Sequence, residues 1–355
     1  ASAPITLLMV AVATWFSAPV GVFLGIFVAS SLLLWFMSHR QTAASIPASL
    51  PGAVLPPALL ARVKRHMRLT AFTVTLGFLA GSEIEVVFLK MYASEDSAGQ
   101  FKVAYQLAMG AALLVPGVFG AVLLPMMASA LKQGAEVAAQ RFVASTRYLA
   151  LLAAPLVAFG VVFATAIVGV LYGTAYAPAA PVFAACLVAG SLLTITQGGS
   201  SLLISADRQG SILAMVSIMA VLKIVLDAVL VIHYGLLGAT IAYLVVSFLH
   251  MSVVMVLAIR ASRAMPDWWL LGRITLAAAV GAAVAYPLLH HLAPLAAVIG
   301  GGLVVCACYL PLTLLFNCWS RGDIEHLRAL HGRLGSRRIG LLDKVLERAH
   351  RRAHA

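Results

Sequence analysis

Charged residues are scarce in this chain of 355 residues, of which they make up only 10%. A typical soluble domain has about 25% charged residues, whereas here 62% of the residues are hydrophobic. This composition excludes an ordinary soluble protein. Because the apolar runs approach the ~20 residues that a membrane-spanning helix needs, we predict an all-α polytopic membrane protein. A membrane β-barrel would instead show alternating segments of about 10 residues.

The sequence also lacks the patterns of common catalytic and metal centres. It has only four cysteines, and they lie within or at the end of apolar runs, as expected of small buried hydrophobic side chains. There is no phosphate-binding P-loop, no GxSxG nucleophile motif and no cluster with metal-ligand spacing. The connections predicted to face away from the cytoplasm are short, at 94–99, 173–181, 233–235 and 290–294. We therefore expect no enzyme activity, no cofactor and no ATP hydrolysis in this chain.

About ten membrane spans are predicted from the positions of the apolar runs. They lie at about 3–18, 19–37, 69–90, 101–127, 146–171, 181–205, 211–232, 236–259, 273–290 and 295–316.

Positive charge is concentrated in particular connections. The net charge of +12 could indicate nucleic-acid binding, but nine of the 24 Lys and Arg residues lie in the last 35 residues and five more lie at 40–68. With ten alternating spans, almost all the others fall on that same side. This is the distribution of cytoplasmic loops, so we predict that both ends of this chain are cytoplasmic and that no nucleic acid is bound.

Two segments on the predicted cytoplasmic side have a distinct composition. Residues 38–68 combine several prolines with basic residues, which is typical of a linker between two helical bundles. The tail at 317–355 repeats apolar residues at helical spacing among basic ones. Such a tail can form an amphipathic helix on the anionic lipids of the inner leaflet, or it can be a solvated tail that only fixes orientation.

Two opposite charges interrupt one of the most apolar stretches, Ile218–Val246. Lys223 and Asp227 are four residues apart, so they share a helix face within reach of a salt bridge. Charges inside a membrane are costly and often mark a transport pathway. One interpretation is that Lys223 offers positive charge to a water-filled cavity, and the other is that the two charges only neutralise each other.

Two acidic residues occur in the outer half of the third predicted span. Glu83 and Glu85 are about 200° apart around a helix, so only one of them can face an interior cavity. Each can be a carboxylate linked to proton or cation movement, or a structural group near the interface. Lys102, near the start of the next span, is a second candidate cation, and snorkelling to the interface explains it equally well.

Several stretches resemble one family of transporters. They are EVVFLKMYA at 85–93, AGQFKVAYQL at 98–107, LPMMAS at 124–129, LYGTAYAPA at 171–179 and YGLLGATIA at 234–242. In this order they are similar to the second lobe of Wzx-type flippases of O-antigen and exopolysaccharide, in the multidrug/oligosaccharidyl-lipid/polysaccharide (MOP) exporter superfamily.

The resemblance implies a MATE-like fold of two six-helix lobes with two further C-terminal helices. It implies that 1–37 are the last two helices of an N-terminally incomplete first lobe, that 38–68 link the lobes, and that 69–260 form the second lobe. Residues 261–316 are then the two further helices, followed by the tail at 317–355.

The resemblance also implies a cargo and a location. The cargo would be a polyprenyl-diphosphate-linked oligosaccharide, which the protein flips across the bacterial inner membrane by alternating access. Its diphosphate needs cationic partners, for which the candidates are Lys223, Lys102 and, at the entrance, Arg147. Glu83 or Glu85 would couple transport to an ion gradient.

Two other functions remain open. One is a multidrug or lipid II exporter of the same superfamily. The other is a non-transporting membrane scaffold that binds a polymerase or other polysaccharide-assembly proteins.

Overall fold

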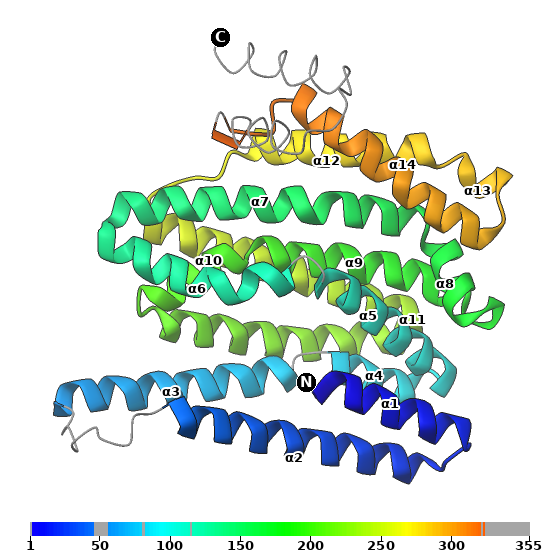
Figure 1. Ribbon diagram of the computed structural model, residues 1–355, viewed down its shortest axis with the longest axis horizontal. Coiled ribbons are helices and arrows are strands. Elements are labelled where there is room, and N and C mark those ends of the chain that lie inside the picture. The colour runs from blue at the N-terminus through cyan, green and yellow to red at the C-terminus, as the bar shows by residue number, and fades with distance from the viewer. Residues whose placement is uncertain (1, 46–55, 80–81, 114–115, 321, 324–355) are drawn as a thin grey trace. The chain divides into compact units, whose positions relative to one another are not determined.

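The computed structural model describes residues 2–45, 56–79, 82–113, 116–320 and 322–323 (Figure 1). These residues form α-helices and one short 3-10 helix, and none of them lies in a β-strand. Among the described residues, six helical stretches are long and apolar enough to cross a membrane: Val20–Ala44, Ala135–Val162, Ala179–Ser205, Gln209–Ser262, Trp268–His291 and Pro294–Leu315. The prediction of an all-α polytopic membrane protein is therefore confirmed.

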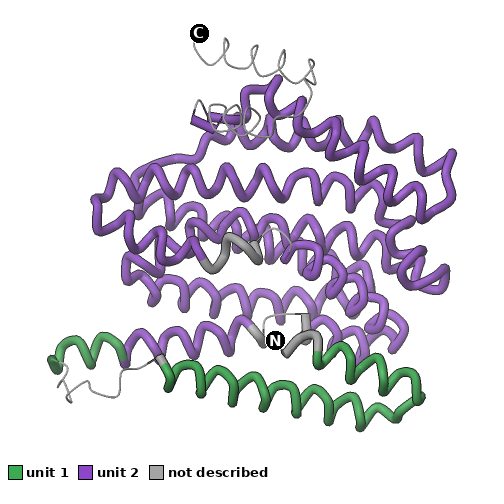
Figure 2. Tube along the Cα trace, in the orientation of Figure 1, with its two compact units in different colours: residues 1–63 green, residues 64–355 purple. Residues whose placement is uncertain are grey.

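The chain divides into two compact units, residues 1–63 and residues 64–355 (Figure 2). In the first unit, α1 (Ser2–Trp15) and α2 (Val20–Ser45) pack against each other as a hairpin. The turn between them places Ser17 at φ 48. Helix α2 continues eight residues beyond the predicted end of its span at 37, because its polar last turns extend the helix past the apolar run. Helix α3 (Pro57–Leu79) begins in this unit.

The second unit contains the remaining helices. Their bounds are α4 Ser82–Tyr92, α5 Glu95–Leu113, α6 Pro116–Gln133, α7 Ala135–Val162, α8 Ala164–Tyr172, η1 Thr174–Tyr176, α9 Ala179–Ile195, α10 Gln197–Ser205, α11 Gln209–Ser262, α12 Trp268–Ala285, α13 Leu288–His291 and α14 Pro294–Leu315. Several predicted spans are divided in two: 101–127 is covered by α5 and α6, 146–171 by α7 and α8, and 181–205 by α9 and α10.

Helix α9 lies at the centre of the second unit. It packs against α5, α7 and α11, and most of its apolar side chains are buried. Small residues allow the close approach that helix packing in a membrane requires. At Gly190, for example, the space that a side chain would need is occupied by Met109 of α5.

Helices α12 and α14 pack against each other and against α7 (Figure 1). The Tyr309 hydroxyl of α14 donates a hydrogen bond of 2.8 Å to the Leu151 carbonyl of α7. The ring of Phe163 occupies the space beside Gly301, where a side chain would clash. These contacts fix the two last spans on the α7 side of the second unit.

Helix α11 is a hairpin of two spans. Its 54 residues are interrupted at Gly235, whose φ of 53 and ψ of −127 are not helical. Three residues later, Gly238 lies so close to the Leu230 carbonyl that the two halves meet backbone to backbone. The predicted turn between spans 211–232 and 236–259 is thus present, and it sets the positions of the side chains on both halves.

Candidate functional site

Three ionisable side chains form a buried ionic cluster, which we define as Glu85, Lys223 and Asp227. The Lys223 ammonium contacts Glu85 Oε1 in a salt bridge and lies 3.5 Å from Asp227 Oδ2. The exposed fraction is 2% for the Lys223 side chain and 0% for both carboxylates. Glu85 lies on α4 and Lys223 lies on α11, so two candidate residues that were predicted in separate spans are in direct contact.

Helix periodicity explains why these charges are buried. On α11, Lys223 and Asp227 share one face with Ala220 and Val231, which are buried too. On α4, Glu85 lies four residues before the fully buried Leu89. On both helices, the charged residues lie on the same face as buried apolar residues. Packing of these faces into the core therefore buries the charges as well.

The ionic cluster contains one cation and two carboxylates. Asp227 Oδ1 and Glu85 Oε2 have no hydrogen-bond partner among the described residues. A buried charge is costly unless it is both paired and hydrogen-bonded. With all three groups ionised, the negative charge exceeds the positive charge by one, so the site is suited to take up a proton or a small cation.

Two aromatic residues complete the surroundings of Lys223. Its ammonium lies 5.8 Å from the ring centroid of Tyr243, on the second half of α11. Tyr105 of α5 packs edge-on against Tyr243, with centroids 5.5 Å apart. Sequence reasoning missed both tyrosines, although the short turn of the hairpin could have placed Tyr243 opposite the charged pair.

The other predicted site residues lie elsewhere. The Glu83 side chain is outside the described part of the structure, so its coupling role stays a prediction. Lys102 is half-buried on α5, and its contact with cargo also stays a prediction. Arg147, on α7, belongs to a second polar network.

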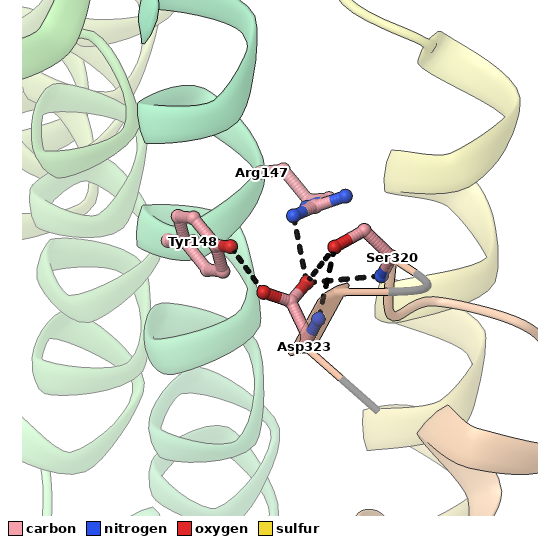
Figure 3. A network of polar contacts seen from close by, with 4 residues as sticks. All are labelled: Arg147, Tyr148, Ser320 and Asp323. Carbon is pink, nitrogen blue, oxygen red and sulfur yellow. Dashed lines mark hydrogen bonds and ion pairs between the residues drawn. The ribbon is translucent and has the colours of Figure 1, made fainter. Parts of the chain in front are cut away.

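This second network, the Asp323 network, joins α7 to the segment that follows α14 (Figure 3). Arg147 Nη2 donates to Asp323 Oδ2 at 2.9 Å, and the Tyr148 hydroxyl donates to Oδ1 at 2.5 Å. Ser320 donates to Oδ2 through its backbone amide at 2.9 Å and its hydroxyl at 2.6 Å. The predicted entrance residue thus holds the beginning of the basic tail against the helical bundle.

The pKa of Asp323 is below its ordinary value of 3.8. Partial burial alone would raise this pKa, but the hydrogen bonds from Ser320 and Tyr148 and the charge of Arg147 outweigh burial and lower it. A carboxyl group with a lowered pKa stabilises the fold above its unfolded-state pKa, and this contribution is lost as the pH falls through the folded-state pKa.

We expect Asp323→Asn to lower the free energy of unfolding by about 1–3 kcal/mol at neutral pH, because hydrogen bonds to a charged group are lost. The difference from the unsubstituted protein should shrink once the pH falls below 3.8. Denaturant titrations of both proteins between pH 3 and pH 7 measure it. Asp207→Asn is the control, and a difference that is independent of pH would contradict the ionic role of Asp323.

A comparison with protein families relates part of this architecture to a known group. Residues 61–181 match the model of a polysaccharide biosynthesis protein family. The matched region runs from within α3 to the start of α9, so it includes Glu85, Lys102 and Arg147 but not Lys223 or Asp227. No curated protein and no solved structure matches the chain. The family match and the membrane helices support a multi-pass membrane protein involved in polysaccharide biosynthesis.

Proposed function

We propose that the protein translocates a polyprenyl-diphosphate-linked oligosaccharide across the bacterial inner membrane by alternating access. The family match supports a role in polysaccharide biosynthesis, and the spanning helices are those of a membrane protein. The observation that carries the proposal is the buried ionic cluster of Glu85, Lys223 and Asp227. Charged residues inside a membrane are costly and usually functional, so a purely structural helix is not expected to contain them.

In the proposed mechanism, protons and cargo compete for the same charges. When both carboxylates are ionised, they neutralise Lys223 and leave an excess negative charge that repels a diphosphate. Each proton that Glu85 or Asp227 takes up removes one negative charge, so the positive charge of Lys223 becomes available to the cargo. Binding of protons and binding of the diphosphate then favour each other, as linkage between two ligands requires. The coupling carboxylate is Glu85, which contacts the ammonium most closely.

Glu85→Gln tests the coupling. The variant keeps the shape of the side chain but can no longer change charge, so we expect export of the glycan to fall about tenfold or more, the effect of losing one charge-assisted interaction. The measurement is surface polysaccharide and lipid-linked oligosaccharide in cells of the source bacterium carrying the substitution. Glu95→Gln is the matched control, because Glu95 is exposed and pairs with Lys90 at the surface.

The outcome also separates transport from a scaffold role. Unchanged export by Glu85→Gln, at normal abundance in the membrane, would overturn the coupling proposal. A scaffold that acts through the basic tail would instead lose function only on deletion of 324–355. That deletion leaves Asp323 and its contacts with α7 in place, so it removes the tail without removing the Asp323 network.

A further inference from the structure

Two hollows follow one another along the seam between α7 and α12, which pack side by side (Figure 1). The first has a volume of about 680 Å³ and lies where α7 begins, α11 ends and α12 begins. The second has a volume of about 670 Å³ and lies between α7, α9 and α12. Leu271 lines both. Each volume is within the ~300–1,000 Å³ that is typical of ligand sites.

One face of α7 lines both hollows. The residues of this face recur every three or four positions, so they form a single stripe along the helix. The stripe runs through Glu136, Gln140, Val143 and Arg147 in the first hollow and through Ala150, Ala154, Val157 and Val161 in the second. The two hollows therefore lie end to end along one face of α7, and we call them together the groove, with a first part and a second part that differ in chemistry.

The first part of the groove carries charged residues of both signs among polar and apolar ones. Arg147 and Arg263 supply two cations, and Glu136 and Asp267 supply two carboxylates. Arg147 shares part of its charge with Asp323, but its buried Nε has no hydrogen-bond partner among the described residues. This arrangement can hold a group that has both an acceptor such as phosphate and a donor such as ammonium.

The second part of the groove is apolar. Its lining consists of alanine and other apolar side chains with only Ser191, Thr275 and Tyr286 as polar residues. From Ala150 to Val162 it extends along α7 for about 18 Å at 1.5 Å per residue. This is close to half of the ~30 Å hydrocarbon thickness of a bilayer. The apolar part thus has the depth of a single leaflet.

Because a part with charges of both signs is followed by an apolar part, we propose that the groove binds one membrane glycerophospholipid. Its head group carries both a phosphate and an ammonium group, as in phosphatidylethanolamine. The phosphate lies against Arg147 and Arg263, and the ammonium lies against Glu136 or Asp267. One acyl chain follows the alanine-lined face between α7, α9 and α12. The inference stands on the groove and does not depend on the proposed transport.

Charge and length distinguish this occupant from other lipids. A purely anionic head group would bring negative charge beside Glu136 and Asp267 but would offer no ammonium group to pair with these carboxylates. A polyprenyl chain is much longer than one leaflet, whereas the apolar part of the groove matches a single acyl chain. A phospholipid with mixed head-group charges satisfies both parts at once.

Binding is tested on the full chain, purified in detergent and measured by native mass spectrometry with added phosphatidylethanolamine, phosphatidylglycerol or polyprenyl phosphate. Ala279→Phe and Ala283→Phe place a ring in the apolar part from exposed positions of α12. A ring that displaces two methylene groups of the acyl chain should weaken binding of phosphatidylethanolamine about tenfold. Val284→Phe is the matched control, because Val284 is exposed on α12 but does not line the groove.

Arg263→Asn tests the first part of the groove. Arg263 has a φ of 57, which asparagine tolerates better than most residues, so the backbone is kept while the charge is lost. We expect about fivefold weaker binding of phosphatidylethanolamine. Arg260→Asn, three residues earlier in the last turn of α11 but outside the groove, should bind normally.

Three outcomes would overturn the proposal. The first is equal binding by the groove variants and their controls, with unchanged gel-filtration profiles. The second is equal or tighter binding of phosphatidylglycerol, and the third is displacement of phosphatidylethanolamine by polyprenyl phosphate. Should the phenylalanine variants not fold, the comparison of Arg263→Asn with Arg260→Asn decides alone.

Discussion

Replacing Lys223 with methionine is expected to destabilise the protein by about 3–5 kcal/mol, because it removes the cation from a buried ion pair and leaves two buried carboxylates uncompensated. The side chain is only 2% exposed, and both of its partners are fully buried. Methionine keeps most of the volume of lysine, so the loss comes from charge rather than from a cavity. The free energy of unfolding in a denaturant titration measures it.

Lys90→Met is the matched control for this prediction. Lys90 also forms a salt bridge, at 3.1 Å from Glu95, but the two side chains are 64% and 81% exposed. An exposed pair contributes about 0–1 kcal/mol. The contrast between the two substitutions therefore reports mainly on burial, since each removes one ammonium group from a salt bridge with a glutamate. A similar effect of both would contradict the view that the ionic cluster is desolvated.

A second substitution tests whether the loss comes from the orphaned carboxylates. Combining Lys223→Met with Glu85→Gln leaves one buried carboxylate instead of two, so the double variant should be more stable than Lys223→Met alone. Residues in direct contact are expected to show such non-additivity. If the two effects simply add, the Glu85 carboxylate does not depend on Lys223.

The sequence predicts an all-α membrane protein correctly because long apolar runs have few alternatives in a bilayer. It predicts the ends of the helices poorly. Helix α7 begins at Ala135, eleven residues before the apolar run suggested, because a helix continues through the membrane interface with polar residues such as Glu136 and Arg141. The helices are interrupted at Phe163 and Thr196, where no glycine or proline marks the break in the sequence. The start of α6, in contrast, is marked by Pro116 at its first position.

The contacts of the candidate site, too, can be predicted only in part from the sequence. The pairing of Lys223 with Asp227 follows from their spacing along one helix. The pairing of Lys223 with Glu85 and that of Arg147 with Asp323 join residues far apart in the chain. No local pattern encodes these pairs, because they depend on how α4, α7, α11 and the segment after α14 pack together.

Gly238→Ala is expected to have the second large effect, because it acts on the hairpin that positions the ionic cluster. A Cβ atom at this position would collide with the Leu230 carbonyl and lie 3.0 Å from the Val231 amide nitrogen. These are backbone atoms, so no rotamer change relieves the clash. Overpacking typically costs about 1–3 kcal/mol, and we expect the upper end of this range or more in a denaturant titration.

Gly210→Ala is the control within the same helix, since nothing lies within 4 Å of a Cβ atom there. It should change the free energy of unfolding by less than about 0.5 kcal/mol. Equal effects of the two alanines would show that the halves of α11 tolerate separation near the turn.

The glycine substitution also reports on the ionic cluster, because the two halves of α11 carry different parts of it. Lys223 and Asp227 lie on the first half and Tyr243 lies on the second. Pushing the halves apart at Gly238 should therefore move the tyrosine ring away from the ammonium while leaving the Lys223–Asp227 spacing within one helix intact. If Tyr243 contributes to the proposed transport, Gly238→Ala should reduce export beyond the reduction in folded protein, and Tyr243→Leu should reproduce that part of the loss without the clash.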